Sequence, residues 1–363
     1  MKPKKIFYVV LSLYAGGLEN GIVNLINNSS KEFKHIVCCL RNKGILSKRL
    51  KPHVKIIEMN MSTGNDYLMP LKLARVISRE DIDLIRAFTE DPLFYSFIPA
   101  MVSRKPLIYY NGGRTFPEKK KRVLLECFLA NRVSAVAVPS IELRDYMHKE
   151  IAIKKENITV IPNGIDLNRF RNNIDKKRKK ETLCIPVNDM VIGTVGRLVE
   201  QKDYPTLLHI AKTVLQKKQH ITFIIVGDGK LRKELENIAK ENDIADKVKF
   251  LGIREDIEEL YQVMDIFILT ARWEGMSNVV LEAMASKKPV LATDVEGMTG
   301  VIENGINGFL FTPGDVDGFV TTILSLTQNE MSRIGENAYR KVKENYSLEN
   351  MIHTYEKLYR KLL

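Results

Sequence analysis

Two glutamates eight positions apart stand in the segment of this sequence that is richest in candidate chemical groups. The segment reads TARWEGMSNVVLEAMASKKPVLATD and covers residues 270–294. Glu274 lies in a polar loop, and Glu282 lies on the helix predicted after it, about one turn beyond Asn278. Ionised carboxylates accept strong hydrogen bonds, so the pair suits the hydroxyls of two sugar rings. A capped helix with two surface glutamates would show the same residues.

The loop after Glu274 contains residues that suit the start of a helix, namely Gly275, Ser277 and Asn278. Ser277 or Asn278 is a good helix N-cap. The amide groups at the amino end of this helix would face an anion, because a helix amino end favours negative charge. We therefore predict that this helix end contributes to a phosphate site.

Two cations follow a second predicted strand, in GTVGRLVEQKD at 193–203. The strand ends in a turn that contains glycine, Arg197 follows this turn, and Lys202 lies five residues after Arg197. Cations at the carboxyl end of a strand suit a diphosphate, since they neutralise the charge that grows on a departing phosphate. An arginine and a lysine on a solvated loop remain the alternative interpretation.

A glycine pair, Gly16 and Gly17, lies between the first predicted strand and its helix, in AGGLEN at 15–20. Glycines there let the backbone approach a phosphate or a sugar closely. We assign Gly16 to an acceptor and Gly17 to a donor. The spacing is not G-x-G-x-x-G, which disfavours a nicotinamide enzyme. A plain tight turn would explain the pair equally well.

The amino-acid composition limits the kinds of molecule that the chain is expected to bind. Lys and Arg number 56 against 44 Asp and Glu, a net charge of +12 that favours anionic partners. The chain lacks the aromatic stacking platform of a single-strand binder, so we predict no nucleic-acid partner. The four cysteines fit no zinc or redox motif, and we expect them to be buried free thiols in a reducing compartment. No metal site is predicted.

Short β-branched runs alternate with amphipathic stretches, which is typical of parallel sheets with crossover helices. The pattern restarts after a polar, basic segment. We therefore predict an α/β fold of two Rossmann-like doubly wound domains, 1–170 and 184–345, that face each other across a cleft, with a basic linker at 171–183. The predicted strands are 6–11, 35–40, 55–58, 84–87, 107–110, 135–139, 158–161, 191–195, 222–226, 248–250, 266–269, 289–292 and 308–311.

The hydropathy pattern predicts a soluble or peripheral protein, because no stretch reaches the roughly 18 apolar residues of a membrane-spanning helix. The basic and apolar N-terminus lacks a small-residue cleavage site, so we expect a cytoplasmic location. The basic run 119–122 precedes an apolar helical run, a pattern suited to an anionic membrane surface at the inner face of the membrane. A solvated basic loop before a core helix is the other interpretation.

Several motifs together resemble a known family. The chain contains, in order and at the expected spacing, GGLEN, VIPNGID, GRLVEQKD, VGDG, FLGIREDI and EGMSNVVLEAMA. This set is similar to the large retaining glycosyltransferase family 4, which has the two-Rossmann GT-B architecture. The similarity covers essentially the whole chain and is densest from about residue 158 to 312. In this architecture the final segment, here 346–363, is a helix that crosses back to the N-terminal domain.

The resemblance implies a role for each candidate. Glu274, the first acid of the family's E-x7-E motif, would contact the transferred sugar, and Glu282 would hold the ribose of the nucleotide. Arg197 and Lys202 would grip the diphosphate, and the backbone at Ile253 would meet the nucleobase. Such enzymes are generally metal-independent and need no cofactor beyond a nucleotide-sugar co-substrate, for which we favour a UDP-sugar over a GDP-sugar. The leaving phosphate is thought to help deprotonate the acceptor on the same face.

One departure from the family pattern concerns the first domain. Phe88 and Asn111 stand where many members carry histidines. Asn111 can still donate hydrogen bonds, and with Arg114 beside it this loop is predicted to bind the acceptor or the donor phosphate. The predicted function is a retaining glycosyltransferase that uses a saccharide or lipid-linked acceptor in polysaccharide or glycolipid biosynthesis. The alternative is a non-catalytic GT-B partner subunit of a glycosylation complex.

Overall fold

The computed structural model of the chain describes residues 2–14, 16–62, 66–113, 120–170 and 174–363, and it divides into two compact units. The first unit contains residues 1–164 together with 348–363, and the second contains 165–347. The chain therefore leaves the first unit after Gly164 and returns to it for its last helix, α13 (Leu348–Leu362).

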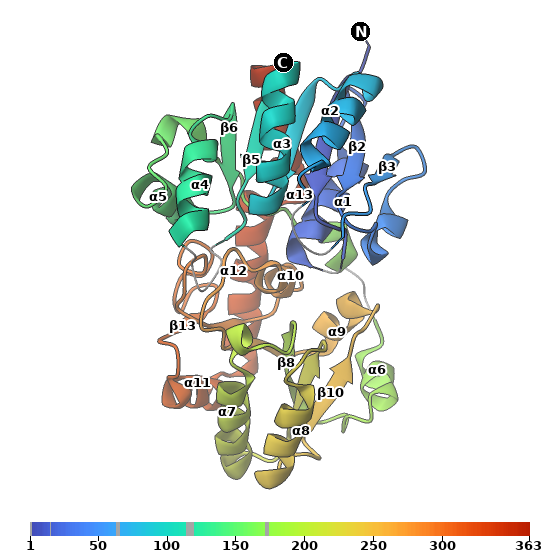
Figure 1. Ribbon diagram of the computed structural model, residues 1–363. Helices are drawn as coiled ribbons and strands as arrows, with labels where there is room; N and C mark the ends of the chain where they lie inside the picture. Colours follow the sequence, from blue (N-terminus) through green and yellow to red (C-terminus); the bar gives the residue numbers. More distant parts are fainter. Residues whose placement is uncertain (1, 15, 63–65, 114–119, 171–173) are drawn as a thin grey trace. The chain divides into compact units, whose positions relative to one another are not determined.

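The first unit is built on seven parallel strands in the order β3-β2-β1-β4-β5-β6-β7 (Figure 1). Strands that are covered on both faces need continuous apolar runs, and most residues of the central strands are buried. The strands are β1 (Lys4–Val10), β2 (Phe33–Cys39), β3 (Lys55–Glu58), β4 (Leu84–Phe88), β5 (Leu107–Tyr110), β6 (Ala135–Val138) and β7 (Ile158–Val160).

Helices cover both faces of the first sheet. Four of them pack on one face, through buried residues such as Leu73 and Phe97. The other face is covered by α1 and α13, through residues such as Ile22 and Tyr355. The helices of this unit besides α13 are α1 (Gly17–Asn28), α2 (Met69–Glu80), α3 (Glu90–Ser103), α4 (Lys120–Ala130) and α5 (Ile141–Lys149).

A buried arginine ties the C-terminal helix to the first sheet. Arg86 of β4 is fully buried, and its Nη1 donates a hydrogen bond of 2.5 Å to the Tyr359 hydroxyl of α13. Its guanidinium lies 4.0 Å from the ring centroid of Tyr355 and 4.6 Å from that of Phe88. Ring faces attract cations, and desolvation strengthens the contact. The helix is thus held by a charge as well as by apolar packing.

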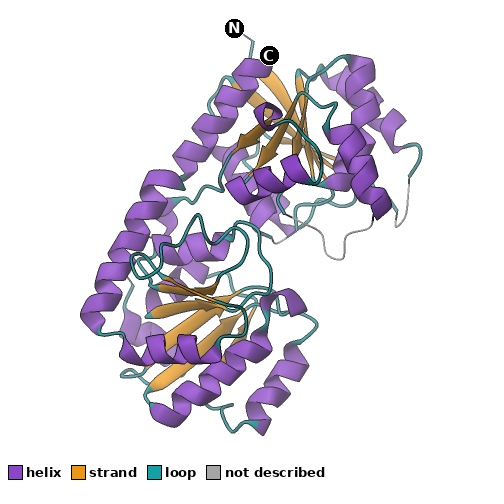
Figure 2. Cartoon of the chain, turned by 90° about the vertical axis from the view of Figure 1, so that its left-hand side faces the viewer, coloured by secondary structure: helices purple, strands orange, loops and turns teal. Residues whose placement is uncertain are grey.

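The second unit is built on six parallel strands in the order β10-β9-β8-β11-β12-β13. Figure 2 shows the strands of each unit between layers of helices. The strands are β8 (Met190–Val195), β9 (Ile221–Val226), β10 (Val248–Gly252), β11 (Ile266–Leu269), β12 (Val290–Thr293) and β13 (Phe309–Phe311).

Three helices pack on each face of the second sheet. Buried residues such as Leu207, Leu235 and Phe319 join α7, α8 and α11 to one face. Residues such as Leu260, Leu281 and Val342 join α9, α10 and α12 to the other. The helices are α6 (Lys176–Thr182), α7 (Tyr204–Lys217), α8 (Arg232–Glu241), α9 (Ile257–Val263), α10 (Asn278–Ala285), α11 (Val316–Ser325) and α12 (Gln328–Asn345).

The predicted α/β fold class is confirmed, and each predicted strand is present with ends that differ by no more than about two residues. The segment predicted as a linker differs, because it contains the helix α6. Asp175 caps this helix by accepting a bond from the Arg178 amide, and Lys179 binds Asp256 and Glu259. This segment therefore belongs to the second unit, and the division falls after Gly164 instead of residue 170.

The cysteines agree only in part with the expectation of buried thiols. All four are free, and two of them, Cys38 and Cys39, are buried in β2. Burial raises the pKa of the Cys38 thiol and that of Cys39, the latter to about 12, so both stay protonated. Cys184 is exposed, because it lies in the turn that follows α6.

Candidate functional site

Loops at the carboxyl ends of four neighbouring strands bring the separate motifs of the second unit to one edge. The order of the sheet places β10, β9, β8 and β11 side by side. Arg197 and Lys202 follow β8, Ile253 follows β10, and Glu274 follows β11. Open α/β folds bind ligands at the carboxyl ends of their strands. We call these four loops, together with the amino end of α10, the rim of the second unit.

Lys202 and Glu274 contact each other directly within the rim. The Lys202 ammonium group donates to Glu274 Oε2, and the two side chains are only 13% and 15% exposed. Such a shielded pair feels a lower effective dielectric than a surface pair, so the interaction is stronger. The contact places a cation suited to phosphate and an acceptor suited to a sugar hydroxyl at one point.

Hydrogen bonds to backbone carbonyl groups link the loop after β8 to the loop after β11. The Arg272 amide donates to the Gln201 carbonyl at 2.8 Å, and Gln201 Nε2 returns a bond of 3.0 Å to the Trp273 carbonyl. Thr270 Oγ1 donates to the Lys202 carbonyl at 3.0 Å. Groups that are fixed before a ligand binds lose less conformational freedom on binding, so this network preorganises the Lys202 and Glu274 pair.

Glycines allow the loop after β9 to pack against the loop after β8. Gly227 has a φ of +130°, and a Cβ atom at this position would lie 2.0 Å from the Gly196 carbonyl oxygen. The Gly227 amide donates to the Gly252 carbonyl at 2.8 Å, and the Leu198 amide donates to the Asp228 carbonyl at 3.0 Å. Three consecutive loops of the rim are therefore linked through backbone contacts that a larger residue would break.

Arg197 and Ile253 differ from Lys202 and Glu274 because they are exposed. The Arg197 side chain makes no hydrogen bond or ion pair with any residue in the described part of the chain. Ile253 is 81% exposed at the end of β10. An unpaired guanidinium can bind phosphate oxygens in a bidentate manner, and an exposed aliphatic side chain can pack against a planar base. Both placements agree with the predicted contacts without testing them.

The amino end of α10 lies three residues after Gly275. Ser277 occupies the predicted N-cap position, but its side chain makes no capping hydrogen bond. The first-turn amide groups have no acceptor within the helix, and Ser277 does not supply one, so they suit an anion. Gly297, at a φ of +86°, packs its Cα against the Gly275 carbonyl oxygen, which a Cβ atom would approach to 2.3 Å.

A tyrosine that the sequence analysis missed positions the second glutamate. The hydroxyl of Tyr261, a buried residue of α9, donates to Glu282 Oε2 at 3.0 Å and lies 3.2 Å from the Val279 carbonyl oxygen. Burial, and then the Glu282 charge, raise the pKa of Tyr261 well above its ordinary value, so the phenol stays protonated. In the sequence, Tyr261 is one apolar position of an amphipathic helix and carries no functional signal.

Replacement of Tyr261 by phenylalanine is expected to raise the donor KM about tenfold and to leave kcat nearly unchanged. The change removes one hydrogen bond to a charged group, the Glu282 carboxylate, worth about 1.5–3 kcal/mol. Tyr346→Phe is the control, because that hydroxyl donates to the Gly300 carbonyl at 2.9 Å in the same unit. Steady-state kinetics measures the effect on donor binding, and thermal melting measures the effect on stability. If both variants lowered the melting temperature equally and neither changed the donor KM, Tyr261 would have a structural role only.

The glycine pair of the first unit lies at the start of α1. Gly16 is the N-cap residue and Gly17 begins the helix. A Cβ atom on Gly16 would lie 2.2 Å from Glu19 Oε2, and Asn20 Nδ2 donates to the Gly16 carbonyl at 2.9 Å. A carboxylate of the chain itself therefore lies over this helix end. The predicted contacts of Gly16 with an acceptor and of Gly17 with a donor remain predictions.

The polar residue predicted after β5 lies inside the first unit. Asn111 is buried, and its Nδ2 donates to the Tyr109 hydroxyl at 3.1 Å and to Glu126 Oε1 at 2.9 Å. An acceptor contact would require this network to open, because both amide hydrogens have partners. Arg114 lies outside the described residues. Phe88 is buried against Arg86, so neither position that many family members fill with histidine presents a polar group at the surface.

The models of two known protein families match most of the chain. The pattern described as Glycosyltransferase Family 4 matches residues 15–169, and the pattern described as Glycosyl transferases group 1 matches residues 175–341. Together with two parallel α/β units and the rim, these matches define a GT-B glycosyltransferase. The chain belongs to glycosyltransferase family 4, and it is a sugar-transferring enzyme.

Relatives and solved structures resemble the chain over nearly its full length. It is 26% identical over 312 residues to the UDP-Gal:alpha-D-GlcNAc-diphosphoundecaprenol alpha-1,3-galactosyltransferase of Escherichia coli, covering 83% of this chain and 81% of that one. It is 25% identical to the capsular polysaccharide biosynthesis glycosyltransferase CapM of Staphylococcus aureus, covering 100% and 98%. The crystal structure of Anabaena Alr3699/HepE with UDP-glucose matches at a TM-score of 0.86 and 25% identity, covering 98% and 99%.

Proposed function

We propose that this enzyme transfers a hexosyl unit from a UDP-sugar to a hydroxyl group of a saccharide or lipid-linked acceptor, with retention of the anomeric configuration. The reaction would serve polysaccharide or glycolipid biosynthesis. The observation that carries the proposal is the contact of Lys202 with Glu274 on a preorganised rim, next to the amino end of α10, where the Ser277 side chain makes no capping hydrogen bond. This arrangement offers phosphate and sugar contacts a few residues apart.

Each side chain of the rim has a role in the proposal. Arg197 and Lys202, with the first amide groups of α10, hold the diphosphate. Glu274 accepts a hydrogen bond from a hydroxyl of the transferred sugar, and Glu282 accepts hydrogen bonds from the ribose. Ile253 packs against the base. Carboxylates suit both hydroxyl contacts because charge-assisted hydrogen bonds are about twice as strong as neutral ones.

The proposed reaction breaks the bond between C1 of the sugar and the oxygen of the β-phosphate. The acceptor oxygen forms the new bond to C1 from the same face, and its proton passes to the departing phosphate oxygen, which gives UDP and the glycoside. Arg197 and Lys202 stabilise the negative charge that grows on the diphosphate. The proposal assigns this charge neutralisation to side chains and amide groups, without a metal ion or a further cofactor.

The likeness to proteins that use UDP supports this donor over a GDP-sugar. The Escherichia coli relative is named for a UDP-Gal donor and a diphosphoundecaprenol acceptor. The Anabaena protein was solved with UDP-glucose. The name of the Staphylococcus aureus relative refers to capsular polysaccharide. These names support a donor class and a biosynthetic role for this chain, and a cytoplasmic location stays part of the proposal.

A non-catalytic partner subunit is the second candidate function. It is favoured by one observation: Phe88 and Asn111 are buried at the two positions where many family members carry histidine. Such a protein would form no glycoside from any nucleotide sugar and would stabilise a co-expressed transferase. Mass spectrometry of products, after incubation of a panel of nucleotide sugars with membrane lipid extract, separates the two candidates.

UDP is expected to quench or enhance the fluorescence of Trp273, the only tryptophan of the sequence, because it lies between Arg272 and Glu274 on the rim. Titration with UDP and GDP in the presence of EDTA measures both affinities. Arg197→Ala should weaken UDP binding at least tenfold, since it removes charge-assisted hydrogen bonds. Lys341→Ala removes the same charge from α12 and should have no effect. Absence of UDP binding at millimolar concentration would overturn the proposal.

A further inference from the structure

Two neighbouring helices of the first unit present apolar side chains to solvent. Helices α3 and α4 contact each other on one face of the sheet (Figure 1). Their outward residues are each between 45% and 75% exposed. These residues are Ile98, Met101 and Val102 on α3, and Leu124, Leu125 and Phe128 on α4. We call this set the α3–α4 surface; contiguous exposed apolar residues mark interaction sites more often than scattered ones.

Three cations surround a shallow hollow at one end of the α3–α4 surface. The hollow has a volume of about 350 Å³, and its lining includes Met101 together with Arg104, Lys105 and Arg132. The Arg132 guanidinium lies 3.8 Å from the centroid of the Phe128 ring. None of the three cations forms an ion pair with a residue that the structure describes. The apolar residues and the unpaired charges therefore form one continuous feature.

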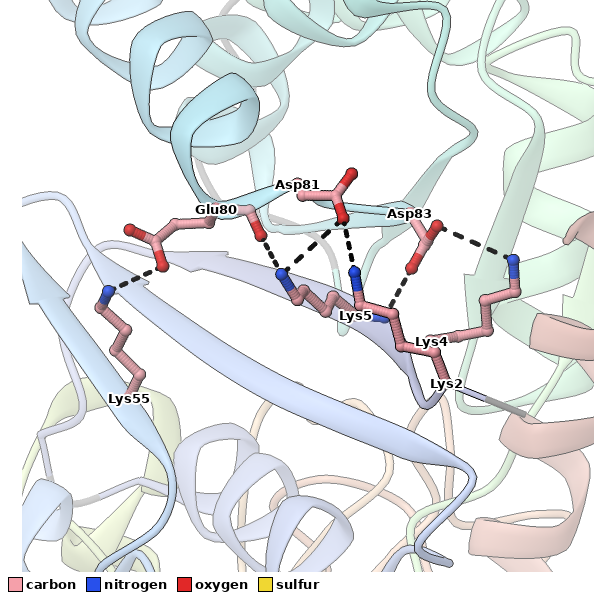
Figure 3. Close-up of polar contacts among 7 residues, drawn as sticks. All are labelled: Lys2, Lys4, Lys5, Lys55, Glu80, Asp81 and Asp83. Carbon is pink, nitrogen blue, oxygen red and sulfur yellow. Dashed lines mark hydrogen bonds and ion pairs between the residues drawn. The ribbon is translucent and has the colours of Figure 1, made fainter.

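Several lysines elsewhere in the first unit are paired with acids. Figure 3 shows those around the start of β1 and the end of α2, where Lys55 binds Glu80 at 2.7 Å and Lys2 binds Asp81 at 3.2 Å. Arg122, in the basic run from which the sequence predicts a membrane contact, binds Asp91 at 2.6 Å. Paired cations attract an anionic surface less, because their partners are repelled by it. The three cations beside the hollow form no such pair within the described part of the chain, so their charge is available to an anionic partner.

We propose that the α3–α4 surface binds the face of an anionic lipid bilayer. The apolar residues enter the boundary of the acyl chains, and Arg104, Lys105 and Arg132 meet the headgroup phosphates. Arginine beside an aromatic ring suits this depth, since the ring is apolar and the guanidinium stays with the phosphate. No helix in the described part of the chain is long and apolar enough to cross a membrane.

Charge complementarity favours a bilayer over a second copy of this chain. A twofold dimer through this surface would bring the same patch of both copies together, and none of the residues named in that patch is an acid that could neutralise the unpaired cations. Anionic headgroups neutralise them instead. The inference goes beyond the transfer reaction, and it rests on the proposed function only in that a lipid-linked acceptor would lie in the same bilayer.

Co-sedimentation with vesicles tests the proposal without donor, acceptor or turnover. The full chain is expected to bind vesicles that contain about one-third phosphatidylglycerol in phosphatidylcholine. It should dissociate from them as the salt concentration rises, and it should not bind vesicles of pure phosphatidylcholine. The double variant Arg104→Gln/Arg132→Gln should bind about 25-fold more weakly, near fivefold for each charge. Met101→Ser/Leu124→Ser should weaken binding about tenfold or more through lost apolar burial.

Matched controls separate this surface from a general attraction by net charge. Lys2→Gln/Lys55→Gln removes two paired charges of the same unit and should bind as the unchanged chain does. Circular dichroism and UDP titration confirm that each variant is folded. Absence of binding to anionic vesicles, or an equal loss in the Lys2→Gln/Lys55→Gln variant, would overturn the proposal. A dimer in solution that Met101→Ser/Leu124→Ser dissociates would assign the surface to self-association instead.

Discussion

Replacement of Glu274 by glutamine is expected to lower kcat about 100-fold or more and to leave the affinity for UDP unchanged or higher. The carboxylate would hold the transferred sugar, and a shift of about 1 Å in a reacting group costs roughly 100-fold in rate. UDP lacks that sugar, so its binding would not depend on the Glu274 carboxylate. The change also removes the negative charge next to Lys202, which frees the ammonium group for the diphosphate.

The opposite directions of the two effects make this prediction specific. Glu200→Gln is the matched control, because Glu200 lies two residues before Lys202, is exposed and binds Lys230. It should change neither kcat nor the UDP affinity measured through Trp273. If Glu274→Gln weakened UDP binding as much as turnover, Glu274 would support Lys202 without contacting the sugar, and the role assigned to it would be wrong.

The strands could be predicted from the sequence because a parallel sheet that is covered on both faces needs uninterrupted apolar runs. β9 reads ITFIIV and is buried along its whole length. Helix α7 has local signals at both ends as well, since Pro205 fixes its first turn and a polar pair follows Lys217. These signals are local, so a single sequence contains them.

The errors arose where distant residues decide the structure. Helix α6 contains no buried residue, so the sequence of this segment resembles that of a solvated linker. It is helical because Asp175 caps it and because Lys179 reaches Asp256 and Glu259, about 80 residues later. Asn111 looked like a surface loop residue for the same reason, since its partner Glu126 lies on the next helix.

The candidate site shows the same limit. Motifs and their resemblance to a family identified Arg197, Lys202, Glu274 and Glu282 one by one. The pairing of Lys202 with Glu274, 72 residues apart, follows only from the order of β8 and β11 in the sheet. The motifs of the sequence indicate which residues have side chains that suit the chemistry. Sheet topology decides which of them neutralise each other, and hence how a charge change at one is felt at the other.

Replacement of Gly227 by alanine is expected to lower the free energy of unfolding of the second unit by about 2–6 kcal/mol. The added Cβ atom would lie 2.0 Å from the Gly196 carbonyl oxygen, which is backbone and cannot rotate away. Overpacking of this kind costs about 1–3 kcal/mol, and alanine at a φ of +130° adds about 1–3 kcal/mol of strain. Protein that still folds should bind UDP weakly, because the displaced turn carries Arg197.

Gly305→Ala separates the steric effect from backbone strain. Gly305 also has a positive φ, +75°, but no heavy atom lies within 4 Å of the position of its Cβ. Its variant should lose only about 1 kcal/mol and bind UDP normally. Denaturant unfolding, together with UDP titration of Trp273 fluorescence, measures both properties. Equal stability of the two variants, with full UDP affinity in Gly227→Ala, would mean that the loops after β8 and β9 are not held together by this contact. The rim would then owe its preorganisation to the hydrogen bonds between the loops after β8 and β11.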